Sequence, residues 1–394
     1  MKKVAILTTF FEADSGYSLI AVVENQIRLL LHHGYDPVVL VDERFKTENP
    51  FWRPYVFDLR PVLPATPTRT LVGRILKEHL AGVDVCLTHD IVLLDQYQPY
   101  DLGMRWCAKF YNDLLWLHFL HSCPSGKRKT PPGYLIYPNA TDKPRVCQVY
   151  GLGGQEWRAI PNRASHTIDP LRVWNYDPLT EAIVSQFNLL DAEVSAVYPT
   201  RLDRGKQPEK ILRLLAGVKK AGYSARLLII DWQSAGEHFQ QYIDELLETA
   251  QELGVDVAFT SRLDNRCEQG VPRHVVTELM DLSNVYIHPS RAETYSLAVH
   301  EAILRGKLVC LNGDFPAMVE LFGESAIYFD FGSDRVAREY RTEQDFWDDE
   351  AMRLIAEIKQ NRGLIAQTKA RREWRPEAMW REFESLLYLK VGNV

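Results

Sequence analysis

The sequence lacks several features that would assign it to a specialised class of protein. No run approaches the roughly 18 uninterrupted apolar residues of a membrane-spanning helix. The N-terminal stretch MKKVAILTTFFEADSG lacks the long apolar segment and small-residue cleavage site of a secretory signal. Short repeats and low-complexity segments are also missing. We therefore expect a cytoplasmic, globular protein without a transmembrane segment.

Cysteine spacing and charge exclude two further classes of site. The six cysteines are scattered, with no CxxC pair and no metal-ligand spacing, which predicts reduced thiols and no metal site. The net charge of −6 gives no support for a dedicated duplex-binding surface, which normally has a concentrated basic face. A dense basic cluster at residues 127–129 lies in a loop containing Gly and Pro. Solvated charge is its ordinary explanation, and contact with an anionic partner is the alternative.

Short apolar runs alternate with amphipathic helical segments along the chain, a pattern typical of parallel β–α–β units. One series fills the first half, and a second begins with SAVYPTR after a polar stretch around residues 163–192. We predict an α/β fold of two doubly wound, Rossmann-like domains, over residues 1–190 and 191–375. A C-terminal helix over 376–394 is expected to pack back on the first domain. A crevice between two such domains is the natural place for a ligand.

Cationic residues in the second half stand where a parallel sheet presents its carboxyl edge. Arg201 and Lys206 follow the first strand of the second series and are suited to phosphate binding. Cations near a helix N-terminus oppose the helix dipole, and a bound anion would relieve that cost. Thr294 and Ser296 are candidate N-caps of the next ligand-facing helix, whose N–H groups could hold the same diphosphate. Surface charge at a helix start is the alternative for the two cations.

Two glutamates lie close to these positions in the sequence. Glu293 and Glu301 are eight residues apart, so on a helix they would return to nearly the same side. Ordinary solvated surface positions are the alternative. Carboxylates do not bind phosphate, but a carboxylate can accept two hydrogen bonds from vicinal hydroxyls. A diphosphate flanked by two polyols is a nucleotide sugar, which places Glu301 at the ribose and Glu293 at the transferred sugar.

These segments resemble the donor-binding domain of retaining GT-B glycosyltransferases of the family 4-like group. The resemblance rests on YPTRLDRGKQPEKI and on HPSRAETYSLAVHEAILRGKLVCLNGDFPAMVEL, which contains two glutamates separated by seven residues. AIPN at 159–162 resembles the segment that ends the family's acceptor domain. The resemblance implies a GT-B architecture with a central cleft, an acceptor-side first domain and a donor-binding second domain. It also implies a nucleotide diphosphate sugar as donor substrate, no cofactor and no metal for the transfer step.

By that resemblance, Glu293 contacts the reacting sugar and Glu301 contacts the ribose. Arg201 and Lys206 match the diphosphate pair that offsets charge on the leaving group, an electrostatic role that often supplies the largest catalytic effect. The remaining donor-side positions are Thr294, Tyr295, Ser296, Leu297, Gly16 and Glu320. Gly16 stands where the family usually has two glycines, and capping of a helix is the alternative role for Glu320.

The first half matches the family more loosely. DVCLTHD and LLWLHFLHS resemble strands that end in histidines facing the cleft. This nominates His121, at a strand end, as a catalytic residue, and His89, His118 and Tyr17 as acceptor-side contacts. For any one of these histidines a structural role is as consistent as contact with substrate.

The activity predicted by the sequence is retaining transfer of a hexosyl group from a nucleotide sugar to an acceptor hydroxyl. Three alternatives stay open: a nucleotide-sugar epimerase of GT-B fold, an inactive binding protein, and a glycosyltransferase acting on a hydroxylated nucleic-acid base. The acceptor could be a sugar, a glycan, a lipid-linked molecule or such a base. The sequence leaves open the donor sugar, its nucleotide base, the linkage and the oligomeric state.

Overall fold

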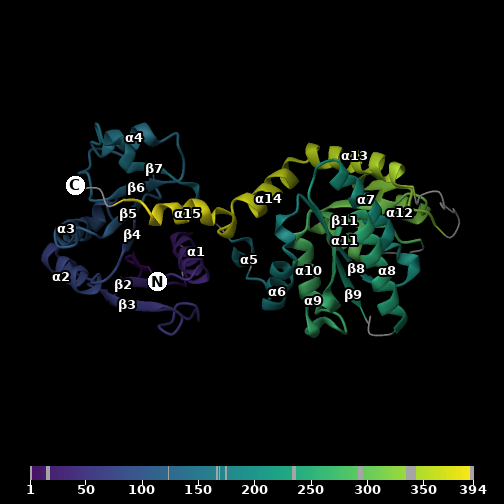
Figure 1. Ribbon diagram of the computed structural model, residues 1–394, viewed down its shortest axis with the longest axis horizontal. Helices are drawn as coiled ribbons and strands as arrows, with labels where there is room; N and C mark the ends of the chain where they lie inside the picture. Colours follow the sequence, from purple (N-terminus) through teal and green to yellow (C-terminus); the bar gives the residue numbers. More distant parts are fainter. Residues whose placement is uncertain are drawn as a thin grey trace. The chain divides into compact units, whose positions relative to one another are not determined.

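The computed structural model describes residues 2–14, 18–122, 124–165, 167, 169–173, 175–232, 237–291, 296–333 and 343–390. The chain divides into two compact units. Unit 1 consists of residues 1–169 and 374–394, and unit 2 of residues 170–373. In each unit a central sheet is covered by helices (Figure 1).

Unit 1 contains a parallel sheet whose seven described strands run in the order β3-β2-β1-β4-β5-β6-β7. The strands are β1 (Lys3–Leu7), β2 (Asp36–Asp42), β3 (Asp58–Leu63), β4 (Val85–His89), β5 (Leu115–Phe119), β6 (Tyr134–Tyr137) and β7 (Ala159–Pro161). The helices are α1 (Ser18–His32), α2 (Arg69–His79), α3 (Gln98–Cys107), α4 (Lys143–Val149) and α15 (Trp380–Leu387). The strand order reverses between β1 and β4, and doubly wound sheets bind ligands at the carboxyl edge of such a switch point.

Both faces of the unit 1 sheet are buried. Val4 and Ile6 of β1 belong to one apolar core, and the alternate residues Ala5 and Leu7 belong to the other. Successive side chains of a strand point to opposite faces, so helices on both sides require a continuous apolar run. This is why KVAIL contains no polar residue after its first position.

The C-terminal segment returns to unit 1. Phe383 of α15 is buried in the same core cluster as Ile27 of α1, and Lys2 Nζ donates a hydrogen bond of 2.7 Å to the Leu387 carbonyl oxygen. The helix is shorter than the predicted 376–394. A 3-10 turn at Glu377–Met379 precedes α15, which ends at Leu387, because the residues after Pro376 form i to i+3 hydrogen bonds before the α-helical pattern starts.

Unit 2 contains a second parallel sheet, whose six described strands have the order β10-β9-β8-β11-β12-β13. The strands are β8 (Val194–Arg201), β9 (Ala225–Trp232), β10 (Asp256–Phe259), β11 (Val285–His288), β12 (Leu308–Asn312) and β13 (Ile327–Phe329). The helices are α5 (Pro170–Val173), α6 (Pro178–Phe187), α7 (Pro208–Lys220), α8 (Glu237–Leu253), α9 (Thr260–Leu263), α10 (Arg273–Leu282), α11 (Leu297–Leu304), α12 (Pro316–Phe322), α13 (Gln344–Gln360) and α14 (Arg362–Glu373). The switch point lies between β8 and β11. The prediction of two doubly wound, Rossmann-like domains is confirmed.

The first unit boundary falls at 169/170, earlier than the predicted boundary at 190/191. The cause is the packing of α6. Its residues Ile183 and Val184 are buried in one cluster with Val197 of β8 and Leu279 of α10. These apolar contacts place the segment within unit 2, although its polar composition resembles that of a linker.

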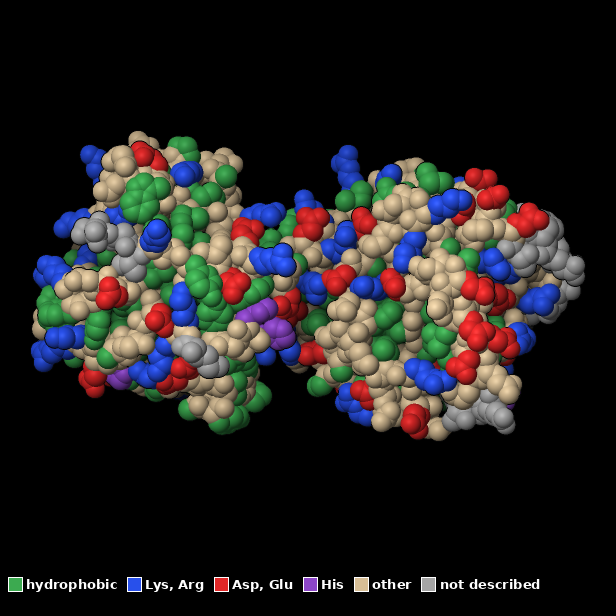
Figure 2. Space-filling view, viewed as in Figure 1, with side chains coloured by type: hydrophobic (Ala, Val, Ile, Leu, Met, Phe, Trp, Pro, Cys, Tyr) green, Lys and Arg blue, Asp and Glu red, His purple; other side chains and the backbone are tan. Residues whose placement is uncertain are grey.

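The described surface mixes charges of both signs. Lys and Arg side chains alternate with Asp and Glu side chains on the face shown in Figure 2. Within the basic cluster at 127–129, Arg128 forms an ion pair with Asp95. In the described part of the chain, no helix has both the length and the apolar character that crossing a membrane requires.

Candidate functional site

The loop after β8 carries the predicted diphosphate pair and is held by its own hydrogen bonds. Arg201 is the last residue of β8. The Asp203 side chain accepts a hydrogen bond of 3.1 Å from the Gly205 amide, and the Tyr198 hydroxyl donates one of 3.0 Å to the Lys206 carbonyl oxygen. Gln207 closes the loop with φ of 50°, in the left-handed region. Because these contacts fix the backbone, the two cations project from a defined loop.

Hydrogen bonds join this loop to the loop after β11. The buried Gln207 amide donates a hydrogen bond of 2.6 Å to the Pro289 carbonyl oxygen and one of 3.3 Å to that of Gly332. The Arg291 amide donates one of 2.8 Å to the Gly205 carbonyl oxygen. The loop with the cations therefore lies against the loop that leads to α11, at the switch point of the unit 2 sheet. Open α/β sheets bind ligands at this place.

The loop after β12 belongs to the same assembly. The buried Asn312 side chain donates hydrogen bonds of 3.0 Å to the Ser290 carbonyl oxygen and 2.6 Å to that of Gly332. The Asp314 side chain accepts a 2.9 Å hydrogen bond from the Gly332 amide. Sequence reasoning assigned no role to Gln207, Asn312 or Asp314. Their partners are distant in sequence, so no local signal identifies them.

Arg201 is placed to exchange partners. Its guanidinium lies 3.5 Å from the Asp203 carboxylate, and its side chain is 64% exposed. An exposed ion pair of this kind contributes about 0–1 kcal/mol. An incoming anion could therefore take over the guanidinium at small cost. Lys206 is half-buried and already takes part in interactions of the folded loop.

Glu301 is in α11, and its carboxylate forms an ion pair with Arg273 at the start of α10. The two side chains differ in exposure, 18% for Glu301 and 72% for Arg273. An exposed arginine can move into solvent, whereas the Glu301 side chain is mostly enclosed. Arg273 was not predicted as a site residue, because it is 28 residues from Glu301 and only the fold brings the two together.

The other predicted donor-side residues differ in burial. Ser296 is buried at the N-cap position of α11, but its side chain makes no capping hydrogen bond with a described residue. Leu297 is 63% exposed, and Glu320 is exposed on α12. Five predicted residues lie outside the described residues: Glu293, Thr294, Tyr295, Gly16 and Tyr17. Of the two glutamates, only Glu301 lies in the described part of the chain, on α11, which begins at Leu297.

His118, predicted as an acceptor-side contact, is a core residue. It is fully buried in β5, and its Nε2 donates a hydrogen bond of 2.7 Å to the Pro132 carbonyl oxygen. Its Nδ1 lies 2.8 Å from the Thr88 hydroxyl and must accept from it, because a neutral imidazole has one donor nitrogen. Burial lowers the pKa of His118 to about 3, which keeps the ring neutral. Both nitrogens are engaged inside the protein, so the prediction of an acceptor contact is wrong.

His89 and His121 form a pair at the carboxyl edge of the unit 1 sheet. Nδ1 of His89 lies 2.8 Å from Nε2 of His121, and the two rings are stacked with centroids 5.1 Å apart. His89 is the buried last residue of β4, and His121 is half-buried two residues beyond β5. One nitrogen of the pair must hold the proton of this hydrogen bond. The arrangement can therefore present a second imidazole proton or lone pair to a hydroxylated ligand.

Asp90 positions this pair and was not predicted. Its carboxylate accepts a hydrogen bond of 2.8 Å from the His121 amide, and its backbone has φ of 55°. Burial raises the pKa of the Asp90 carboxyl, and the hydrogen bond from the His121 amide opposes that shift. A non-glycine residue at positive φ beside a strand end often marks a functional site.

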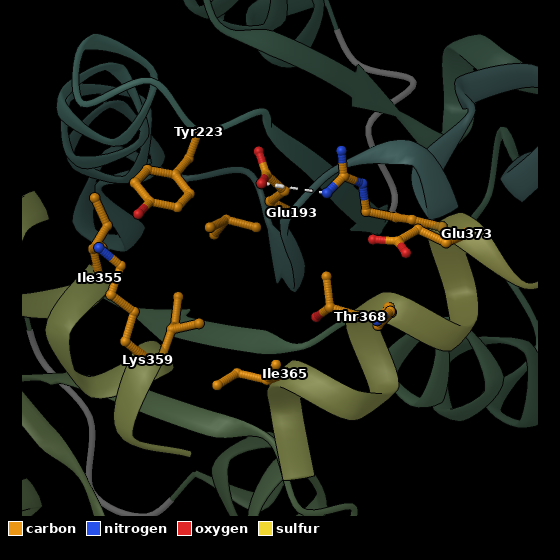
Figure 3. Close-up of a pocket in the computed structure, with 11 residues that line it drawn as sticks. Glu193, Tyr223, Ile355, Lys359, Ile365, Thr368 and Glu373 are labelled. Carbon is orange, nitrogen blue, oxygen red and sulfur yellow. Dashed lines mark ion pairs between the residues drawn. The ribbon is translucent and has the colours of Figure 1, made fainter. Parts of the chain in front are cut away.

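A cavity of about 330 Å³ opens in a different part of unit 2 (Figure 3). It lies beside Val194, the first residue of β8, and between α13 and α14, hence at the amino edge of the sheet. Its wall contains the ion pair of Arg372 with Glu193, whose charged atoms are 3.3 Å apart. The predicted donor residues follow the carboxyl ends of the strands, so this cavity is not the predicted donor site.

Comparisons with known proteins give similarity to solved structures only. No family model matches the sequence, and no curated protein matches it. A glycosyltransferase from Rickettsia africae is similar at 11% identity, covering 100% of this chain and 99% of that chain, with a TM-score of 0.34. Anabaena HepE in complex with UDP-glucose is similar at 13% identity, covering 99% and 100%, with a TM-score of 0.36. WaaG, a glycosyltransferase of lipopolysaccharide biosynthesis, is similar at 14% identity, covering 97% and 98%, with a TM-score of 0.31.

Two of these three structures are glycosyltransferases by description, and the third holds a nucleotide sugar. TM-scores of this size do not by themselves establish a shared architecture. The fold assignment therefore stands on the strand orders of the two sheets.

Proposed function

We propose that the chain is a retaining glycosyltransferase of the GT-B class, which transfers a hexosyl group from a nucleotide diphosphate sugar to an acceptor hydroxyl. One observation carries the proposal. The loop with Arg201 and Lys206 is hydrogen-bonded to the loop that leads into α11, the helix of Glu301, at the switch point of unit 2. Cations for a diphosphate and a carboxylate for hydroxyl groups thus follow neighbouring strands.

Each described donor residue has a proposed role. Arg201 and Lys206 bind the diphosphate and offset the charge that develops on it as the sugar leaves. The weak pairing of Arg201 with Asp203 lets the diphosphate replace that carboxylate at little cost. Glu301 exchanges Arg273 for the ribose hydroxyls. Glu293, which lies outside the described residues, is assigned to the transferred sugar.

The transfer step follows from these roles. The bond between the anomeric carbon and the diphosphate oxygen breaks, and the acceptor oxygen bonds to the same face of that carbon. The acceptor proton passes to the leaving phosphate oxygen, so the step requires no protein nucleophile, no cofactor and no metal. We assign acceptor binding to unit 1, with the His89 and His121 pair as its polar contact, and we expect the protein to act in the cytoplasm.

A panel of UDP-, GDP- and ADP-sugars tests the proposal by thermal shift and by donor hydrolysis. A ligand present at about 100 times its Kd, bound only by the folded state, stabilises that state by about 2.7 kcal/mol. We expect one nucleotide class to raise the melting temperature of the natural chain. Glu301→Ala and Lys206→Ala should lose that shift.

The matched control is Lys219→Ala. Lys219 lies near the far end of α7, the helix that follows Lys206, and its partner Asp256 is exposed. Its removal should leave the donor shift unchanged. If Glu301→Ala and Lys206→Ala both show the same rise in melting temperature as the natural chain, these residues do not bind the donor. Donor hydrolysis without any rise in melting temperature would contradict binding at this loop.

A further inference from the structure

Two histidines and a glutamate from distant parts of the sequence meet on unit 1. His32 is the last residue of α1, His33 follows it, and Glu377 begins the 3-10 turn before α15. One ligand atom from each residue lies within 4.8 Å of the other two. Nε2 of His33 is 3.2 Å from Oε2 of Glu377. The sequence alone does not indicate a metal site here, because 344 positions separate His33 from Glu377.

The central ligand of this group has a fixed orientation. The His33 ring stacks on the Trp380 ring with centroids 3.8 Å apart and planes 1° apart. Trp380 is itself buried in the core with Phe383. The His32 ring meets the His33 ring edge-on, with centroids 4.9 Å apart. Packing that fixes the ring plane of a ligating histidine favours metal binding, because less freedom is lost when the ion binds.

The donor set suits a transition metal ion. Imidazole nitrogens and a carboxylate oxygen bind Zn²⁺ at about 2.0–2.2 Å, so ligand atoms of a tetrahedral site lie about 3.4 Å apart. The observed 3.2 Å between His33 and Glu377 is close to that spacing. His32 and Glu377 are exposed, so small changes of their side-chain torsions can close the remaining distance. We propose that His32, His33 and Glu377 form a binding site for a divalent transition metal ion of the zinc class, with water as the fourth ligand.

The site lies away from the proposed acceptor residues. Helix α1 follows β1 and runs back toward the amino edge of the sheet, where the Asp36 amide bonds to the Lys2 carbonyl oxygen. His89 and His121 are at the carboxyl edge. The proposed ion is therefore structural, and it is compatible with a transfer step that uses no metal.

The position of Glu377 suggests what the ion does. The chain passes from unit 2 back to unit 1 at 373/374, three residues before Glu377. An ion held by α1 and by this turn would fasten the returning segment to unit 1 next to the boundary. His32 and Glu377 are exposed, so ions in solution can reach the site.

Calorimetric titration with ZnCl₂ tests the site on the full-length, untagged chain after treatment with EDTA, since a histidine tag would itself bind Zn²⁺. We expect one ion per chain. His32→Ala and Glu377→Gln should each weaken binding by about tenfold or more. His79→Ala, which removes a histidine at the end of another unit 1 helix, should bind as the natural chain does.

Thermal unfolding supplies a second readout. Saturating Zn²⁺ should raise the melting temperature of the natural chain by roughly 5 °C, and should not do so in His32→Ala. Circular dichroism without metal verifies that both variants fold, as expected for exposed positions. Absence of binding to the natural chain would overturn the proposal, and so would unchanged affinity in either ligand variant. None of these outcomes depends on donor binding.

Discussion

The carboxyl edges of the two sheets are built in opposite ways. In unit 2, buried amides such as Gln207 and Asn312 fix the loops, while Arg201 is exposed at the surface of that frame. In unit 1, the functional candidates are themselves enclosed, because His118 is fully buried and His89 nearly so. The charged groups of unit 2 can exchange partners with a ligand. The imidazoles of unit 1 are mostly committed to the protein.

This difference shows how far sequence position can locate each kind of residue. A charged residue at a strand end remains near the surface because burying a charge is costly, so its sequence position indicates where it can act. A histidine is mostly neutral near pH 7 and fits a core when both nitrogens are paired. His118 and His121 look alike in LLWLHFLHS, yet only the fold shows that His118 faces Thr88 and Pro132.

The largest effect should come from the exposed charges of unit 2. Lys206→Ala is expected to reduce the rate of sugar transfer about 100- to 1,000-fold, because it removes charge stabilisation from the leaving diphosphate. Steady-state kinetics with the donor identified by the panel measures this effect. Lys219→Ala serves again as the control, and a loss of less than tenfold in Lys206→Ala would break the contrast between the two units.

The next effect concerns the frame that holds those charges. Gln207→Asn introduces a residue that tolerates positive φ and shortens the side chain by one carbon, so its amide cannot reach both Pro289 and Gly332. Leaving buried carbonyl groups unpaired should lower the free energy of unfolding by about 1–3 kcal/mol. Urea unfolding measures that change. An unaltered midpoint together with normal donor affinity would show that the amide does not organise the loop.

His118 should make the stability of unit 1 depend on pH. The pKa of His118 in the folded chain, about 3, is below the ordinary value of 6.5. Between these two pH values the imidazole is protonated in the unfolded chain and neutral in the folded chain. The free energy of unfolding is therefore highest above about pH 6.5. It decreases as the pH falls toward about 3, by up to about 1.4 kcal/mol per pH unit. Urea unfolding at pH 7 and pH 5 should show a smaller fall in His118→Gln than in the natural chain. Equal falls would contradict this account of His118.

The smallest predicted effect lies at the half-buried histidine. His121→Ala should raise the KM for the acceptor about tenfold, which corresponds to about 1.4 kcal/mol, with little change in donor affinity. Initial rates at varied acceptor concentration measure it. An equal loss of donor affinity would place His121 in the donor site and remove the distinction between the units.

The sequence predicted regular elements better than long-range pairs. The apolar run LVCLN forms β12, as a sheet buried on both faces requires. The strand β3 has no such apolar run, since DLRPVL contains two charges and a proline, which only an edge strand tolerates. Arg273 and Asp90 escaped prediction because their roles arise from contacts across 28 and 31 positions.

The central claim is that Glu301 leaves Arg273 to bind the ribose of the donor. The most direct test is a binding cycle that compares the donor with its 2′,3′-dideoxyribose analogue, on the natural chain and on Glu301→Ala. We predict that the natural chain binds the analogue at least about tenfold more weakly than the donor. Glu301→Ala should bind both ligands with the same low affinity. Arg273→Ala should bind the donor at least as tightly as the natural chain does. An equal loss for the analogue in the natural chain and in Glu301→Ala would contradict the claim.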